Sequence, residues 1–141
     1  MRLAVLLAML AGVSVAFQAS LTSAAQRTLG PVVLVAISGL TTSLVALAIS
    51  VFLARPEFTA RAVVYAVVSG VLGALILGSI AFAAGQGGVA RALSLVIGTQ
   101  LVAGLLVDRI GLFGAGAGEI GAMTVLGVLL IFAGGVLVVR Y

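Results

Sequence analysis

The chain has 141 residues, of which 64% are hydrophobic and 7% are charged, with seven basic and three acidic side chains. Ordinary soluble domains are about 25% charged, so the composition excludes a water-soluble surface and indicates an all-α integral membrane protein with a single domain over residues 1–141. There is no Cys, His or Trp, which excludes disulfides, His-dependent hydrolysis and the common transition-metal sites. We therefore expect no enzyme activity, no catalytic residues, no metal and no cofactor.

Five stretches are long and apolar enough to cross a bilayer, which takes roughly 20 residues of helix. They are too long and too continuously apolar for the alternating strands of a membrane β-barrel. Gly30 and Pro31 mark the start of the second stretch, and the GQGG sequence at 85–88 closes the third. The expected helices cover about residues 3–24, 31–54, 62–84, 89–107 and 121–139.

The first stretch has two interpretations. Arg2, the apolar run that follows it and the small residues Ala24 and Ala25 resemble a secretory signal peptide. The run is also long enough to span a bilayer, and we expect a first transmembrane helix.

The connections between these stretches are short, so neighbouring helices are expected to be antiparallel. Glu57 and Arg61 are four residues apart and are expected to pair at the start of the third helix. The longest connection, 108–120, is expected to lie in the membrane interface. Asp108 and Arg109 are expected to end the fourth helix, and Glu119 lies favourably near the N-terminus of the fifth.

Polar or small side chains recur at helical spacing in four of the five stretches. Lipid offers no hydrogen bonds, so these faces are expected to turn inward. They are Ser14, Gln18 and Thr22 in the first helix, Ser38, Thr41, Thr42 and Ser43 in the second, Tyr65, Ser69 and Gly73 in the third, and Gln100, Gly104 and Asp108 in the fourth.

Two explanations fit these faces. Hydrogen bonds between helices stabilise membrane bundles, at about 0.6 to 2 kcal/mol per polar contact. Alternatively, the side chains contact a solute, because a primary amide has two donors and two acceptor lone pairs that one helix neighbour rarely satisfies. The candidate substrate-binding residues are Gln18, Gln100, Ser14, Thr22, Tyr65, Ser69 and Gly104.

The fifth helix has a different pattern, with small and apolar residues at spacings of three and four. This seam is expected to pack against another helix, and in one version of this expectation that helix is its equivalent in a second copy. Its residues are Thr124, Gly127, Ile131 and Gly134.

The seven arginines are spread singly near the ends of the apolar stretches. That distribution suits anchoring in lipid headgroups and not nucleic-acid binding, which needs a clustered basic face. Four arginines fall on the N-terminal side of the five-helix topology and three on the other. This weak asymmetry mildly favours a cytoplasmic N-terminus and allows insertion in both orientations.

No ionisable residue lies in the middle of a stretch, which argues against proton exchange through a buried carboxylate.

The whole chain, over all five stretches, resembles the YdcZ-like family of small bacterial membrane proteins, within the drug/metabolite transporter superfamily. The clearest pieces are FQASLTSAAQRTLGP (17–31) and LSLVIGTQLVAGLLVDRIGLFG (93–114). The second contains Gly-x-Gln within the fourth helix and Asp-x-x-Gly-Leu-Phe-Gly after it. In the first, the family tends to have Asn where this chain has Thr22. The resemblance implies a five-helix transporter unit, half of a ten-helix inverted-repeat fold completed by dimerisation.

These observations predict a multi-pass transporter of the bacterial inner membrane that moves a small solute by alternating access. Its expected partners are membrane lipid, an unidentified small-molecule substrate and a second, antiparallel copy of the chain, because transporter sites commonly lie between two inverted repeats. Two alternatives remain. One is a passive dual-topology channel lined by Ser, Thr and Gln, and the other is a structural or accessory membrane subunit whose polar faces bind a partner protein.

Overall fold

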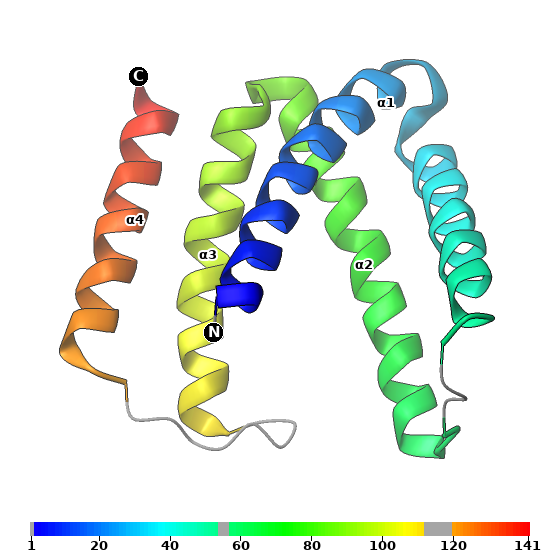
Figure 1. The fold of residues 1–141 in the computed structure, drawn as a ribbon. Coiled ribbons are helices and arrows are strands. Elements are labelled where there is room, and N and C mark those ends of the chain that lie inside the picture. The colour runs from blue at the N-terminus through cyan, green and yellow to red at the C-terminus, as the bar shows by residue number, and fades with distance from the viewer. Residues whose placement is uncertain (1, 54–56, 112–119) are drawn as a thin grey trace. The chain divides into compact units, whose positions relative to one another are not determined.

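A computed structural model of the protein describes residues 2–53, 57–111 and 120–141. The described residues form helices without strands: α1 (Arg2–Ser50), α2 (Ala60–Gly87), α3 (Val89–Ile110) and α4 (Ala122–Arg140) (Figure 1). All four are long and apolar enough to cross a membrane, so the expected all-α class is confirmed. Residues 1–85 form one compact unit and residues 86–141 form another.

α1 is 49 residues long and is broken at Gly30, whose φ of 71° and ψ of 162° lie outside the helical region. Pro31 follows, and proline disfavours a helical conformation in the residue before it. Glycine adopts the required positive φ without steric cost. Figure 1 shows α1 turning back on itself between its blue and cyan parts. The expected helices 3–24 and 31–54 fall on either side of this break, but α1 stays helical through residues 25–29, which contain no Gly or Pro.

The buried side chains of the first unit gather near the break in α1 and in the C-terminal half of α2. Two glycines of α2 lie where the helices approach closely. A Cβ at Gly85 would collide with the side-chain amide of Gln26, and one at Gly78 would meet Cγ2 of Val35 at 3.5 Å. α2 therefore packs against both parts of α1. The buried residues are Ala19, Thr22, Ser23 and Leu34 of α1 and Ile80, Ala81 and Ala84 of α2.

Thr59 caps the start of α2. Its hydroxyl oxygen accepts a hydrogen bond from the backbone N–H of Ala62 at 3.3 Å, which satisfies one of the free donors of the first turn. The expected pairing of Glu57 with Arg61 is wrong. The helix begins at Ala60, so Glu57 precedes it, and no ion pair joins these two described residues.

In the second unit, α3 lies between two glycines of positive φ, Gly88 at 88° and Gly111 at 68°. The N–H of Gly111 donates to the carbonyl of Val107 at 3.0 Å, the usual way for glycine to close a helix. Asp108 and Arg109 were expected to end this helix, but they lie within its last turn, where Arg109 suits the negative end of the helix dipole. Residues 112–119, including Glu119, lie outside the described residues.

α3 and α4 pack through one glycine on each helix. A Cβ at Gly98 of α3 would approach Cδ2 of Phe132 to 3.1 Å, and one at Gly135 of α4 would approach the Ser94 carbonyl oxygen to 3.2 Å. Val128 of α4 is also buried. The α4 face that meets α3 thus follows Val128, Phe132 and Gly135.

That face is displaced by one residue, or about 100° around the helix, from the seam expected in the sequence. A Cβ at Gly127 or Gly134 would meet no atom within 4 Å. The seam is therefore not the surface that packs on α3. Its packing against a second copy of the chain stays a prediction.

We predict that Gly135→Leu lowers the free energy of unfolding by about 1–3 kcal/mol, the usual cost of forcing a larger side chain into a packed interface. The new side chain must displace the Ser94 backbone, which cannot move as a side chain can. Titration with a denaturing detergent, followed by circular dichroism, measures the change. Gly70→Leu of α2 is the control, since a Cβ at Gly70 would meet no atom within 4 Å. Equal losses in the two variants contradict this account of the packing.

Candidate functional site

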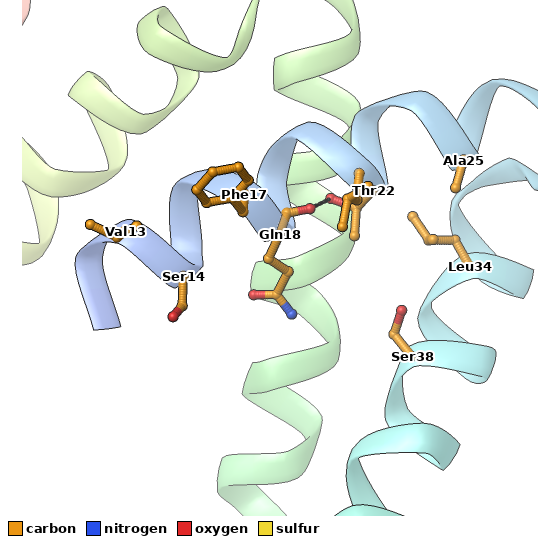
Figure 2. A pocket seen from close by; sticks show the side chains of 9 residues that line it. Val13, Ser14, Phe17, Gln18, Thr22, Ala25, Leu34 and Ser38 are labelled. Atoms are coloured by element: carbon orange, nitrogen blue, oxygen red, sulfur yellow. Dashed lines mark hydrogen bonds between the residues drawn. The ribbon is translucent and has the colours of Figure 1, made fainter. Parts of the chain in front are cut away.

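A pocket of about 530 Å³ lies beside α1 in the first unit. Its apolar walls are Val13, Phe17, Leu21, Ala25 and Leu34. Its polar lining is Ser14, Gln18, Thr22 and Ser38 (Figure 2).

Both parts of α1 contribute to this pocket. Ser14, Gln18 and Thr22 are spaced four residues apart and so form a stripe on one face of the first part. Leu34 and Ser38 form the same kind of pair on the second part. Because the chain reverses at Gly30, these two faces come together. Figure 2 shows the Gln18 amide and the Ser38 hydroxyl extending from the two parts toward the space between them.

The hydroxyl groups of the first part are already engaged. Ser14 donates to the carbonyl of Leu10 at 2.9 Å, and Thr22 contacts the carbonyls of Gln18 at 2.9 Å and Ala19 at 3.2 Å. Bonding to the preceding turn is the normal way for a helical hydroxyl to satisfy its proton. Their oxygens keep acceptor capacity toward the pocket.

The two other polar groups of the pocket are not engaged in this way. Neither the Gln18 amide nor the Ser38 hydroxyl forms a hydrogen bond with any part of the chain that the structure describes. Gln18 is exposed and Thr22 is 5% exposed, so the pocket has a closed floor and an open side. The site therefore offers both donors and acceptors to an entering molecule.

Three of the seven expected site residues, Ser14, Gln18 and Thr22, thus line one pocket, and the other four do not. Tyr65 and Ser69 lie on exposed positions of α2. Gln100 of α3 is exposed and lies two positions after Gly98, on roughly the opposite face from α4. Gly104 is partly exposed, and a Cβ there would meet nothing within 4 Å. Solute binding by these residues stays a prediction.

Ser38 is the pocket residue that the sequence did not single out. It stood among the polar residues of the second helix, with nothing to separate it from Thr41, Thr42 and Ser43. Those three donate to carbonyls of their own helix, whereas Ser38 lines the pocket. The available signal was its place two turns after the Gly30-Pro31 break, four residues beyond Leu34.

A second pocket, of about 270 Å³, lies in the second unit near the end of α3 and the start of α4. Arg109 is the one charged residue among its described lining, and Val102, Leu105 and Leu106 supply apolar wall on α3. An arginine with its charge at a helix end and apolar surface beside it suits the headgroup anchoring expected for this residue.

The family described as "Putative inner membrane exporter, YdcZ" matches residues 3–137 of the chain. The chain belongs to the YdcZ family. The resemblance carried by residues 17–31 and 93–114 is thereby confirmed. No curated protein and no solved structure matches the chain. The description of this family supports a transport role at the inner membrane, and the pocket in α1 lies within the matched residues.

We predict that Gln100→Leu leaves the thermal melting temperature nearly unchanged but reduces solute export. Gln100 makes no hydrogen bond with the described chain and does not face α4, so its loss removes no contact within the second unit. Gly98→Leu provides the contrast, because it should disrupt the packing on Phe132 and lower the melting temperature. A Gln100→Leu protein that melts normally and exports normally contradicts a solute role for this residue.

Proposed function

We propose that the chain is a five-span exporter that works as an antiparallel homodimer and moves a small solute by alternating access. The pocket between the two parts of α1 is the proposed solute site. Gln18 binds the solute through its amide, Ser38, Ser14 and Thr22 provide further hydrogen bonds, and the apolar walls hold the rest of the molecule.

The number of spans follows from length. At 1.5 Å per residue, the 49 residues of α1 amount to about 74 Å of helix, more than twice the roughly 30 Å thickness of a bilayer core. The break at Gly30 lets α1 cross the membrane twice, once with the part before Gly30 and once with the part after it. With α2, α3 and α4, each long enough to cross once, the chain spans the membrane five times and its ends lie on opposite sides.

The observation that carries the solute site is the unpaired amide of Gln18. Gln18 is exposed in the single chain, so in a membrane its amide faces lipid, which offers no hydrogen bonds, at a cost of a few kcal/mol. Hydroxyl groups avoid that cost by bonding to their own helix, as Ser14 and Thr22 do, but Gln18 forms no such bond. A polar solute, or the water that precedes it, supplies the missing partner.

Two features support the proposed antiparallel pair: the odd number of proposed spans and the open side of the pocket. Transporter folds commonly place the solute site between two inverted repeats, and a chain with five spans supplies only one such repeat. The pocket has its open side at Ser14 and Gln18, both exposed in the single chain. A second, inverted copy provides the missing repeat and the missing wall.

We predict that Gln18→Leu abolishes export while the protein still inserts and folds. Leu has a similar size and removes all hydrogen-bonding capacity. Untargeted mass spectrometry of the medium from cells expressing the protein identifies the exported solutes, and their disappearance in the variant measures the effect. Gln86→Leu, at the exposed end of α2, is the matched control.

Export that survives Gln18→Leu refutes the pocket as the solute site. The channel alternative has its own signature: unitary currents in planar bilayers without saturable counterflow in proteoliposomes. A protein inert in both assays that co-purifies with one partner favours the accessory subunit.

We predict that a cysteine added after Tyr141 is reachable from both sides of intact cells in comparable fractions. The arginine distribution specifies neither orientation strongly, and the chain has no native cysteine to confuse the label. Two lysines added near Arg2 should bias the N-terminus toward the cytoplasm and reduce export. Co-expression of a variant biased the other way should restore it. Labelling from one side alone contradicts the antiparallel homodimer and favours a paired homologue or a parallel dimer.

A further inference from the structure

The pocket in α1 has no charged group in its described lining. None of its nine residues carries an ionisable side chain. The two arginines of α1 that the structure describes point elsewhere. Arg27 follows Gln18 by nine positions and Arg2 precedes it by sixteen, which at 100° per residue places both on about the opposite face of the helix. An ion in this pocket would therefore find no counter-charge among the described lining residues or the described arginines of α1.

The pocket nevertheless offers a balanced set of neutral hydrogen-bonding groups. Gln18 presents two amide donors and a carbonyl acceptor, and Ser38 presents a hydroxyl that can do either. Ser14 and Thr22 have committed their protons to backbone carbonyls, so their oxygens can only accept. A molecule that both donates and accepts matches this set better than one that only accepts.

The remaining surface is apolar and includes an aromatic ring. Phe17 is 69% exposed, and its side chain lines the pocket together with Val13, Leu21 and Leu34. Aromatic rings prefer offset-stacked or edge-to-face neighbours, which stabilise a bound ring beyond simple burial. The volume of about 530 Å³ lies within the roughly 300–1,000 Å³ of small-molecule sites.

We propose that this pocket selects an uncharged amphipathic solute, with a ring or similar apolar body against Phe17 and a neutral amide-like group paired with Gln18, and rejects the corresponding anion and cation. This inference rests on the proposed function, since it assigns a substrate class to the same site. Its physical basis is desolvation: an ion that leaves water for a site without a counter-ion loses several kcal/mol. A neutral amide loses less and recovers two hydrogen bonds from a facing glutamine amide.

Three probes of nearly the same shape separate charge from size: benzamide is neutral, benzoate is an anion and benzamidinium is a cation. We expect benzamide to bind the purified full-length protein at least about tenfold more tightly than either ion, because the penalty for an unpaired charge exceeds the ~1.4 kcal/mol that a tenfold difference represents. Saturation-transfer NMR and thermal shift in detergent, at neutral pH and fixed ionic strength, measure the three affinities.

The variant Gln18→Glu reverses this order. Glutamate has nearly the shape of glutamine and adds one negative charge, so benzamidinium should become the preferred probe and benzoate should bind least. Ser38→Asp places a charge on the other wall of the pocket and makes the same prediction if Gln18→Glu does not fold. Gln86→Glu introduces the same change at the exposed end of α2 and should leave benzamide preferred.

Equal binding of the three probes by the wild-type protein, or a preference for either ion, overturns the proposed selectivity. Absence of binding by all three overturns the proposed solute class as well. Neither result tests whether the pocket is the site of solute export. That question is answered by the Gln18→Leu export measurement, which does not depend on the chemical class of the solute. Loss of export in that variant without benzamide binding retains the site and rejects the class.

Discussion

The bilayer core contains no hydrogen-bond donors or acceptors, and this constraint organises the polar chemistry of the chain. Hydroxyl side chains meet it locally: Ser14, Ser20 and Thr22 of α1, and Ser94 of α3, each donate to a carbonyl one turn earlier. Such bonds let a hydroxyl sit in a membrane helix at little cost. A glutamine side chain is longer and its amide carries two donors, and the side-chain amides of Gln18 and Gln100 form no hydrogen bond in the described chain. The amides therefore depend on something outside their own helix, which makes them the groups around which a solute site is proposed.

The features predictable from the sequence were those that local chemistry decides. The apolar stretches, the break before Pro31 and the four-residue spacing of Ser14, Gln18 and Thr22 required no knowledge of packing. Pro31 removes a backbone donor and Gly30 supplies the positive φ, so the position of the reversal could be predicted from the sequence. The exact ends were not, because residues 25–29 and Gly85–Gly87 continue their helices, although the charged, polar and glycine residues there suggested loops.

Rotation of the helices about their axes was the main quantity that the sequence did not reveal. α4 is apolar on all sides, and a helix without a polar face gives no direction for its packing surface. Phe132 against Gly98, and Gly135 against the Ser94 carbonyl, decide that rotation through steric fit between two helices. Ser38 was not predicted as a site residue for the same reason. Nothing in the sequence separates it from Thr41, Thr42 and Ser43, and only the reversal at Gly30 places it in the pocket.

The glycines divide into two groups, and the division bears on assembly. A Cβ added at Gly98 or Gly135 would come within 3.1–3.2 Å of an atom of the neighbouring helix, so the lack of a side chain at these two positions is explained within the second unit. Gly104, Gly127 and Gly134 face nothing within 4 Å. Glycine inside a helix costs about 1 kcal/mol relative to alanine, and close approach of another helix is the usual compensation in membranes. In the proposed antiparallel dimer these positions are where a second copy comes near, on faces of α3 and α4 that their mutual packing leaves open. In the same proposal, a second copy closes the open side of the pocket in α1, where the Gln18 amide has no hydrogen-bond partner in the described chain.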